Sequence, residues 1–164
     1  MNAGIQKLVS GCILVAGILM GSASTANADD GYLVLNTFAY HFENFNEREA
    51  FTPGVGWEYS PSNKIGWHVG TLSDSFGYQS SYGGLNYATG SIFNNRMRFL
   101  LGATILHKQF RANGDPETKI VPLPAVEFRL TNRAVLNLSG SPQVDYRDHR
   151  NNAVLFFQLK LDLQ

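Results

Sequence analysis

The sequence predicts an all-β protein, an eight-stranded, antiparallel, up-and-down β-barrel of the outer-membrane type. Three observations lead to this fold class. Apolar and polar residues alternate with a period of two over most of the chain, and no segment after the N-terminus shows a convincing helical period. Short turns alternate with long charged loops, as in membrane barrels. Aromatic residues lie near the predicted strand ends or on apolar faces, as they do at membrane interfaces.

The first 28 residues are expected to be a secretory signal peptide. Lys7 precedes a short apolar run over 12–20, and small residues ending at Ala28 follow it, which is the layout of a cleavable signal. The apolar run is too short to cross a bilayer as a helix. Cleavage after Ala28 leaves residues 29–164 as one barrel domain.

The predicted mature domain has no cysteine and almost no net charge. Cys12 is the one cysteine of the chain and lies in the signal segment, so no disulfide is expected. A lipoprotein cleavage box would also end at Cys12. In lipoproteins, however, the cysteine follows the apolar run, whereas Cys12 is the first residue of the run here. The whole chain carries 13 cationic and 13 acidic residues, which does not favour a nucleic acid as partner.

The first half of the domain divides into four predicted strands. Residues 31–42 alternate between two faces and end around His41. After a polar loop, residues 54–59 alternate glycine and glutamate with large residues, and a Pro-Ser-Asn turn follows. Residues 65–72 alternate glycine and histidine with bulky apolar residues, and residues 79–88 are rich in glycine and tyrosine.

The second half repeats this form, with predicted strands at 96–107, 119–130, 133–139 and 153–163. The last is the clearest, because leucines and a phenylalanine occupy one face while glutamine, lysine and aspartate occupy the other. The strand count fits soluble lipocalin-like barrels and small outer-membrane barrels equally. The loop lengths and aromatic positions favour the outer-membrane barrel, and a soluble periplasmic carrier is the alternative.

Candidate reactive residues end the first and third predicted strands. His41 ends the first, and Asp74 and Ser75 follow the third. In an up-and-down barrel these strands run the same way, so the three residues share one rim, and their types suit acyl transfer. A strand lies between them, which separates their axes by about 10 Å, so a loop or a substrate must bring them together. The alternative is that Asp74 and Ser75 form an ordinary turn.

Several motifs together carry a resemblance to a known family. They are Tyr40-His41-Phe42, Pro53-Gly54-Val55-Gly56, Ser73-Asp74-Ser75-Phe76, Gly83-Gly84-Leu85-Asn86-Tyr87, Val121-Pro122-Leu123-Pro124 and Pro142. From about Phe38 to the end, the chain resembles the lipid A palmitoyltransferase (PagP) family. The resemblance implies an enzyme of the bacterial outer membrane that moves a fatty acyl chain from a phospholipid to lipid A. It also implies that His41, Asp74 and Ser75 are catalytic, and that no cofactor or metal takes part.

The prolines and inward-facing residues suggest how such a barrel binds lipid. Pro122, Pro124 and Pro142 lack an N–H and should leave the bonding between the sixth and seventh strands incomplete. The resemblance implies lateral lipid access there; the alternative is that these prolines only mark strand ends. Gly84 is expected to leave space inside the barrel. Asn86 falls where the family has a small residue at the pocket floor, so we expect a shorter acyl chain than palmitate.

The lumen away from His41 is expected to hold a hydrogen-bonded plug. Strand parity places the following polar residues inward: Glu58, His68, Asn86, Gln158, Lys160 and Asp162. Cations of the long loops either contact lipid phosphates or are solvated surface charges. These cations are Lys108, Arg111, Lys119, Arg147 and Arg150. We expect outer-membrane lipids as partners and a monomeric protein.

Three departures from the family pattern leave a non-catalytic barrel as the alternative function. Only Asp29 and Asp30 precede the first strand, where the family has an amphipathic helix. The loop after His41 is shorter than usual. The chain also ends in Gln164 and not in the terminal aromatic residue that outer-membrane barrels commonly have.

Overall fold

A computed structural model of the chain describes residues 31–43, 48–111, 114–146, 149–151 and 153–163, with the side chains of 144–151 left out. The predicted signal peptide, Asp29, Asp30 and Gln164 lie outside the described residues. No helix long and apolar enough to cross a membrane occurs among these described ranges.

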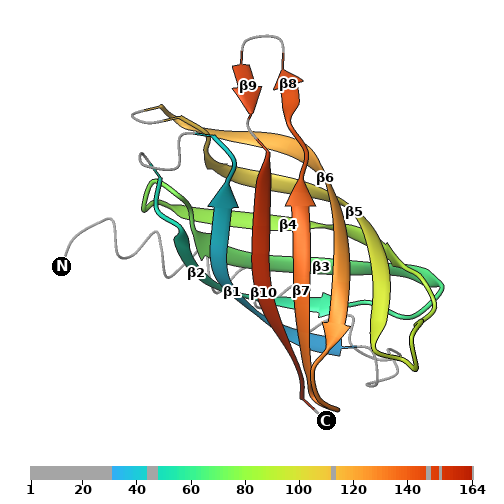
Figure 1. Ribbon diagram of the computed structural model, residues 1–164. Coiled ribbons are helices and arrows are strands. Elements are labelled where there is room, and N and C mark those ends of the chain that lie inside the picture. Colours follow the sequence, from blue (N-terminus) through green and yellow to red (C-terminus); the bar gives the residue numbers. More distant parts are fainter. Residues whose placement is uncertain (1–30, 44–47, 112–113, 147–148, 152, 164) are drawn as a thin grey trace, which may run out of the picture.

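Eight antiparallel strands close into a barrel, as predicted (Figure 1). Each barrel strand pairs with the barrel strands that precede and follow it along the chain, and β1 pairs with β10 to close the sheet. Every barrel strand therefore has a partner on both sides over at least part of its length. The barrel strands are β1 (Gly31–His41), β2 (Phe51–Tyr59), β3 (Lys64–Ser73), β4 (Gln79–Ala88), β5 (Met97–Gln109), β6 (Pro116–Arg129), β7 (Ala134–Ser141) and β10 (Val154–Asp162).

The connections differ between the two ends of the barrel. At the loop end, where β1 finishes, the connection between β7 and β10 contains a small hairpin of β8 (Val144–Tyr146) and β9 (His149–Asn151), which stands above the barrel in Figure 1. The sequence predicted only a loop there. At the turn end, the connection over 89–96 is longer than the short turn predicted at Gly90 and is closed by a bridge between Ile92 and Met97.

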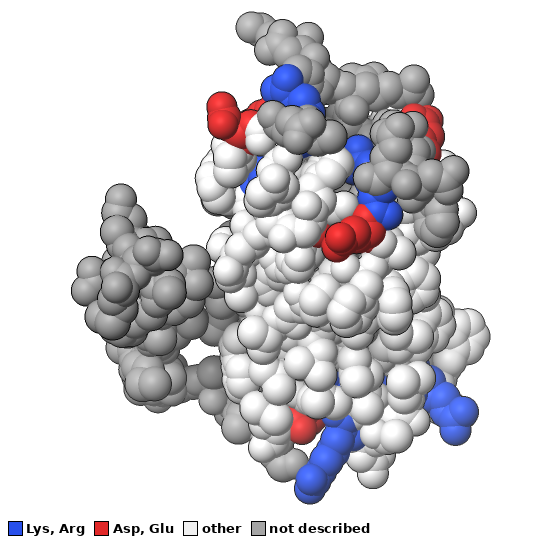
Figure 2. Space-filling view, turned by 90° about the vertical axis from the view of Figure 1, so that its left-hand side faces the viewer, with Lys and Arg blue, Asp and Glu red and all other residues white. Residues whose placement is uncertain are grey.

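The barrel is apolar outside and polar inside. Large hydrophobic side chains are exposed on each of the strands β2 to β6, including Val55, Ile65, Leu85, Leu101, Ile105 and Ile120. Aromatic side chains are exposed towards both ends, including Phe38, Tyr40 and Phe51 at the loop end and Trp57, Trp67, Tyr87, Phe99 and Phe128 nearer the turn end. On the face shown in Figure 2, charged side chains gather towards the two ends and leave a band of uncharged residues between them. The large hydrophobic side chains exposed on the strands make this band largely apolar.

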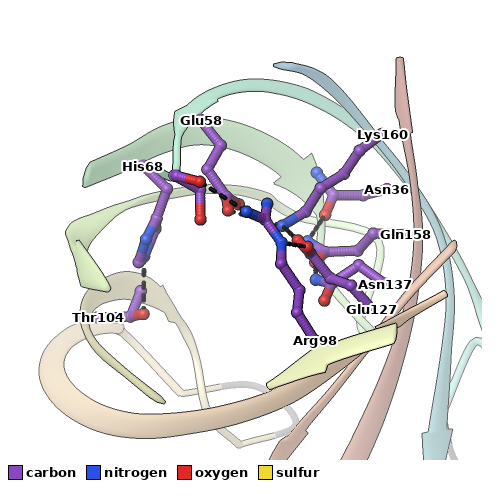
Figure 3. A network of polar contacts seen from close by, with 10 residues as sticks. Asn36, Glu58, His68, Arg98, Thr104, Glu127, Asn137, Gln158 and Lys160 are labelled. Atoms are coloured by element: carbon purple, nitrogen blue, oxygen red, sulfur yellow. Dashed lines mark hydrogen bonds and ion pairs between the residues drawn. The ribbon is translucent and has the colours of Figure 1, made fainter. Parts of the chain in front are cut away.

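A buried charged network fills the lumen near the turn end (Figure 3). The Lys160 ammonium donates to Glu58 at 2.7 Å and to Glu127 at 2.5 Å, and Arg98 pairs with the second oxygen of Glu127. Beside it, Gln158 accepts from Asn137 at 2.5 Å and donates to Asn36 at 2.6 Å. We call these seven residues the polar plug. The predicted plug is confirmed for Glu58, Gln158 and Lys160, whereas Arg98 and Glu127 were missed.

One irregularity in β1 changes which residues face the lumen. The pairing of β1 shifts register between Asn36 and Phe38 on both sides. Against β10, Thr37 is the extra residue and forms a β-bulge, whereas against β2 the extra residue lies on β2. Before the bulge, the even-numbered residues Tyr32, Val34 and Asn36 are buried; after it, the odd-numbered Ala39 and His41 are buried. The sequence predicted uninterrupted alternation along this strand, which is wrong. Without the bulge, His41 would face outward.

Candidate functional site at the loop end

His41 and Ser75 are joined by a hydrogen bond. His41 Nε2 lies 2.6 Å from Ser75 Oγ, and both residues are buried, at 2% and 3% exposure. The interstrand spacing suggested that they would not meet without loop movement or substrate. The structure brings them together, in a geometry suited to proton transfer from the hydroxyl to the imidazole.

The connection between β3 and β4 leans over the lumen and carries Ser75 to His41. The pairing of β2 with β3 ends at Gly54 and Leu72, so the end of β3 is free to cross the start of β2. The backbone N–H of Glu49 then donates to the carbonyl of Ser75 at 2.9 Å and ties the loop after β1 to this turn. Gly77, at φ 80°, allows the chain to reverse.

Asp74 is a structural residue of this turn and does not contact His41 in any hydrogen bond. Its Oδ1 accepts the backbone N–H groups of Phe76 at 2.9 Å and Tyr78 at 3.1 Å. Its Oδ2 accepts the hydroxyl of Ser80 and the backbone N–H of Gln109, each at 3.1 Å. All four bonds fix the turn and dock it on β5, so Asp74 positions Ser75 and does not orient the imidazole.

The second nitrogen of His41 faces a cation. Arg48 Nη1 lies 3.5 Å from His41 Nδ1. His41 is the last residue of β1 and lies at the loop end, beyond the apolar band. Burial, followed by the charges of Arg48 and Lys108, lowers the pKa of His41 from 6.5 to about 4. The imidazole is therefore neutral near pH 7, which a general base must be.

A cavity with a mostly apolar wall opens near this histidine–serine pair. Arg48, which contacts His41, lines the cavity, whereas His41 and Ser75 themselves do not. The volume of the cavity is about 120 Å³, and it runs from the loop end down to the polar plug. Since a water needs about 10 to 15 Å³ in the same measure, the cavity holds several waters or a short apolar chain. The side chains that line it near the loop end are Leu72, Leu106, Val121, Leu123, Val154 and Phe156.

The inward glycines make less free space than the sequence suggested. A Cβ on Gly56 or Gly70 would collide with the hydroxyl of Tyr82, so these glycines accommodate that ring. A Cβ on Gly84 would lie 2.9 Å from His68 Nε2, and Gly84 does not line the cavity. Asn86 is 6% exposed and does line it. Asn86 therefore keeps its predicted place in the cavity wall, and Gly84 does not.

The prolines of β6 coincide with a break in strand pairing. β6 pairs with β5 along its length, from Pro116 to Phe128, but pairs with β7 only from Ala125 to Arg129. Pro122 and Pro124 lie in the part without a β7 partner, exposed on the outer surface. This incomplete bonding was predicted. Pro142, also exposed, follows the last residue of β7.

The rim cations are arranged differently from the prediction. Lys108 and Lys119 belong to strands β5 and β6 and not to loops, and Lys108 lines the cavity. Arg111 pairs with Glu117 at 2.7 Å on the surface. The side chains of Arg147 and Arg150 lie outside the described residues. Arg48, which the sequence analysis missed, also lines the cavity. Its place in the polar loop after His41 was the available signal.

Within the described ranges, no group of three or more metal-binding side chains gathers in one place. No protein-family model matches the chain, and no curated protein matches it. Among solved structures, the chain is similar to the outer membrane protein Ail of Yersinia pestis, determined in a phospholipid bilayer nanodisc. The sequence identity is 10%, the TM-score is 0.44, and the match covers 80% of this chain and 97% of Ail.

Proposed function

We propose that this protein is an outer-membrane enzyme that transfers a fatty acyl group from a phospholipid to a hydroxyl of lipid A. The observation that carries the proposal is the 2.6 Å bond between His41 Nε2 and Ser75 Oγ. Two neighbours of His41, Arg48 and Val154, line a mostly apolar cavity. Lipid A as acceptor and phospholipid as donor come from the resemblance of the motifs around His41 and Ser75 to the lipid A palmitoyltransferase family.

The distribution of apolar side chains supports a membrane location. A soluble barrel buries its apolar side chains, whereas here the buried residues include Glu58, Arg98, Glu127 and Lys160 and the outer surface carries large hydrophobics. Aromatic residues at both ends of the apolar band would sit at the lipid headgroups. A closed barrel satisfies its backbone groups within lipid.

The chemistry follows from the roles that the two side chains can take. His41 accepts the proton of Ser75 while Oγ attacks the ester carbonyl of the donor, and the lysophospholipid leaves with that proton. A lipid A hydroxyl then attacks the acyl-serine, and Ser75 is restored. In a second route, His41 deprotonates the acceptor hydroxyl directly and Ser75 positions it by hydrogen bonding. Both routes need a neutral His41.

The cavity would hold the acyl chain. Its upper wall is apolar, which suits a methylene chain entering from the site of ester cleavage. Asn86, Tyr82 and the polar plug form the lower lining, so a long chain has no apolar path to the turn end. The break between β6 and β7 offers a lateral route for lipid from the membrane.

A non-catalytic barrel is the second candidate function, and one observation favours it. Tyr82 occupies the space above Gly56 and Gly70, and the plug fills the turn end, so much of the lumen is packed with side chains. Such a barrel would serve as a small structural or binding protein.

Mass spectrometry of lipid A separates the two candidates. The full chain would be expressed in an export-competent bacterial host, beside the Ser75→Ala and His41→Ala variants. The proposal predicts an added acyl mass that is absent in both variants, and this mass gives the chain length. Folded wild-type protein in the outer membrane without any added mass would favour the non-catalytic barrel.

A further inference from the structure

The geometry points to a phosphate-binding pair at the cavity mouth, formed by Arg48 and Lys108, which holds the phosphate group of a lipid beside His41 and Ser75. This inference rests on the proposed function and extends it to the headgroup of the substrate.

Both cations line the cavity, and one of them contacts the reactive pair. Arg48 and Lys108 line the upper part of the cavity, and Arg48 Nη1 lies 3.5 Å from His41 Nδ1. Lys108 lies on the inner face of β5, in line with the inward residues Thr104 and Leu106. The next residue, Gln109, donates its N–H to Asp74 and so fixes this end of β5 against the turn that carries Ser75.

Lys108 makes no ion pair among the residues that the structure describes. Its ammonium lies 5.4 Å from the centroid of the Phe110 ring, a cation–π contact. The carboxylate that faces it, Asp74, already accepts four hydrogen bonds from its own turn and from β5. Lys108 is half-buried, with Asp74 as a nearby carboxylate that forms no ion pair with it.

A bound anion would be attracted by both cations. Arg48 and Lys108 are half-buried and close enough to repel each other, and an anion placed between them offsets this repulsion. The guanidinium fork of Arg48 matches a tetrahedral phosphate, and Lys108 supplies a point charge. Directly below them the wall is apolar. A molecule with a phosphate and an acyl chain, which is the chemistry of a phospholipid, complements both parts.

The test is a binding measurement that needs no turnover. The full-length mature protein with Ser75→Ala is folded in dodecyl maltoside, a detergent without phosphate, and titrated by calorimetry. The probes are dihexanoylphosphatidylglycerol, dihexanoylglycerol without phosphate, and inorganic phosphate. The variants are Arg48→Gln and Lys108→Gln. Lys64→Gln is the matched control, because it removes the same charge from an exposed position at the turn end.

We expect each of Arg48→Gln and Lys108→Gln to weaken phosphatidylglycerol binding about tenfold or more, the effect of losing one charge-assisted hydrogen bond. Binding of dihexanoylglycerol should not change, and Lys64→Gln should bind like the parent. Lys108→Arg keeps the charge and should bind within a few fold of the parent, which separates lost charge from a folding defect.

Two results would overturn the inference. One is unchanged phosphatidylglycerol binding in both glutamine variants. The other is an equal loss for the phosphate-free lipid, which would make the two cations part of the cavity wall only. The titration with inorganic phosphate identifies the source of the anion. If inorganic phosphate binds in a way that depends on Lys108, the site also takes free phosphate. If inorganic phosphate does not bind, the site takes a phosphate only as part of a lipid. The binding measurement uses the Ser75→Ala variant, which is expected to have no turnover. Its outcome therefore does not depend on whether the wild-type protein transfers acyl groups.

Discussion

At the scale of single residues, His41 and Ser75 could be identified from the sequence but their contact could not. Strand parity and spacing placed them on one rim with a strand between them. The contact depends on the turn after β3. The bond from Gln109 to Asp74 ties this turn to β5, and the bond from Glu49 to Ser75 ties it to the loop after β1. These bonds join segments that are far apart in the sequence, and no local pattern reports them.

Asp74 gives a prediction that separates positioning from chemistry. Asp74→Ala leaves three backbone N–H groups and the Ser80 hydroxyl without their acceptor, so we expect a loss of about 2 kcal/mol or more in the free energy of unfolding, together with lost acyl transfer. Ser75→Ala should abolish transfer with far less effect on stability. Urea unfolding in lipid vesicles measures the stability of both variants, and product analysis measures their acyl transfer. Equal stability of Asp74→Ala and wild type would contradict the structural role of Asp74.

The titration of His41 gives a second prediction at this scale. Its folded pKa of about 4 lies below the usual value of 6.5. The unfolded chain therefore binds more protons than the folded protein between these two values, and the contribution of His41 to stability falls as the pH drops from 6.5 towards 4. NMR of the imidazole ring should therefore show a neutral His41 at pH 5.5. Arg48→Gln removes one cause of the shift and should raise the pKa towards 6.5. A wild-type pKa near 6.5 would refute the buried, cation-flanked environment.

At the scale of elements, the strands could be predicted far better than the bulge in β1. All eight barrel strands lie where alternation placed them, with ends shifted by a few residues, because a closed barrel repeats one period around its wall. The bulge at Thr37 follows from how β1 pairs with β2 and β10, and it reverses the parity of His41. The β8–β9 hairpin is likewise a pairing between short segments that lack a strong periodic pattern.

The incomplete pairing of β6 with β7 leads to a prediction about lipid access. Continuing the register beyond Ala125 and Ser139 brings Pro124 opposite Gly140. A disulfide between Pro124→Cys and Gly140→Cys would join the strands at the break, and oxidation should abolish acyl transfer that reduction restores. The matched control is Val126→Cys with Leu138→Cys, a pair already in register, which should transfer equally in both states. Unchanged activity of the oxidised Pro124 pair would rule out this lateral route.

At the scale of the whole molecule, the barrel combines a charge-balanced lumen with an outer surface that carries large hydrophobic side chains. The plug balances Glu58 and Glu127 against Arg98 and Lys160 within the lumen. Buried ion pairs add little net stability, but removing one partner leaves the other charges buried without a counter-charge. The sequence predicted a plug from the parity of β2 and β10. The partners on β5 and β6 were missed because their contribution depends on contacts across the lumen.

Lys160→Met tests the plug. The methionine keeps much of the side-chain volume but leaves two buried carboxylates beside Arg98 alone, so we expect a loss of about 3 to 5 kcal/mol in the free energy of unfolding. Lys64→Met removes an exposed lysine and should change stability by well under about 1 kcal/mol. Urea titration of both variants in vesicles gives the comparison. Similar stability of the two would contradict a structural role for the plug.

Acyl transfer by the purified protein is the central claim, and reconstitution tests it most directly. The mature protein, folded in detergent, would be mixed with a phospholipid donor and lipid A, and both products followed by mass spectrometry. The account predicts lysophospholipid and acylated lipid A in equal amounts, with neither formed by Ser75→Ala or His41→Ala. Absence of both products from folded wild-type protein, across donors of several chain lengths, would contradict it.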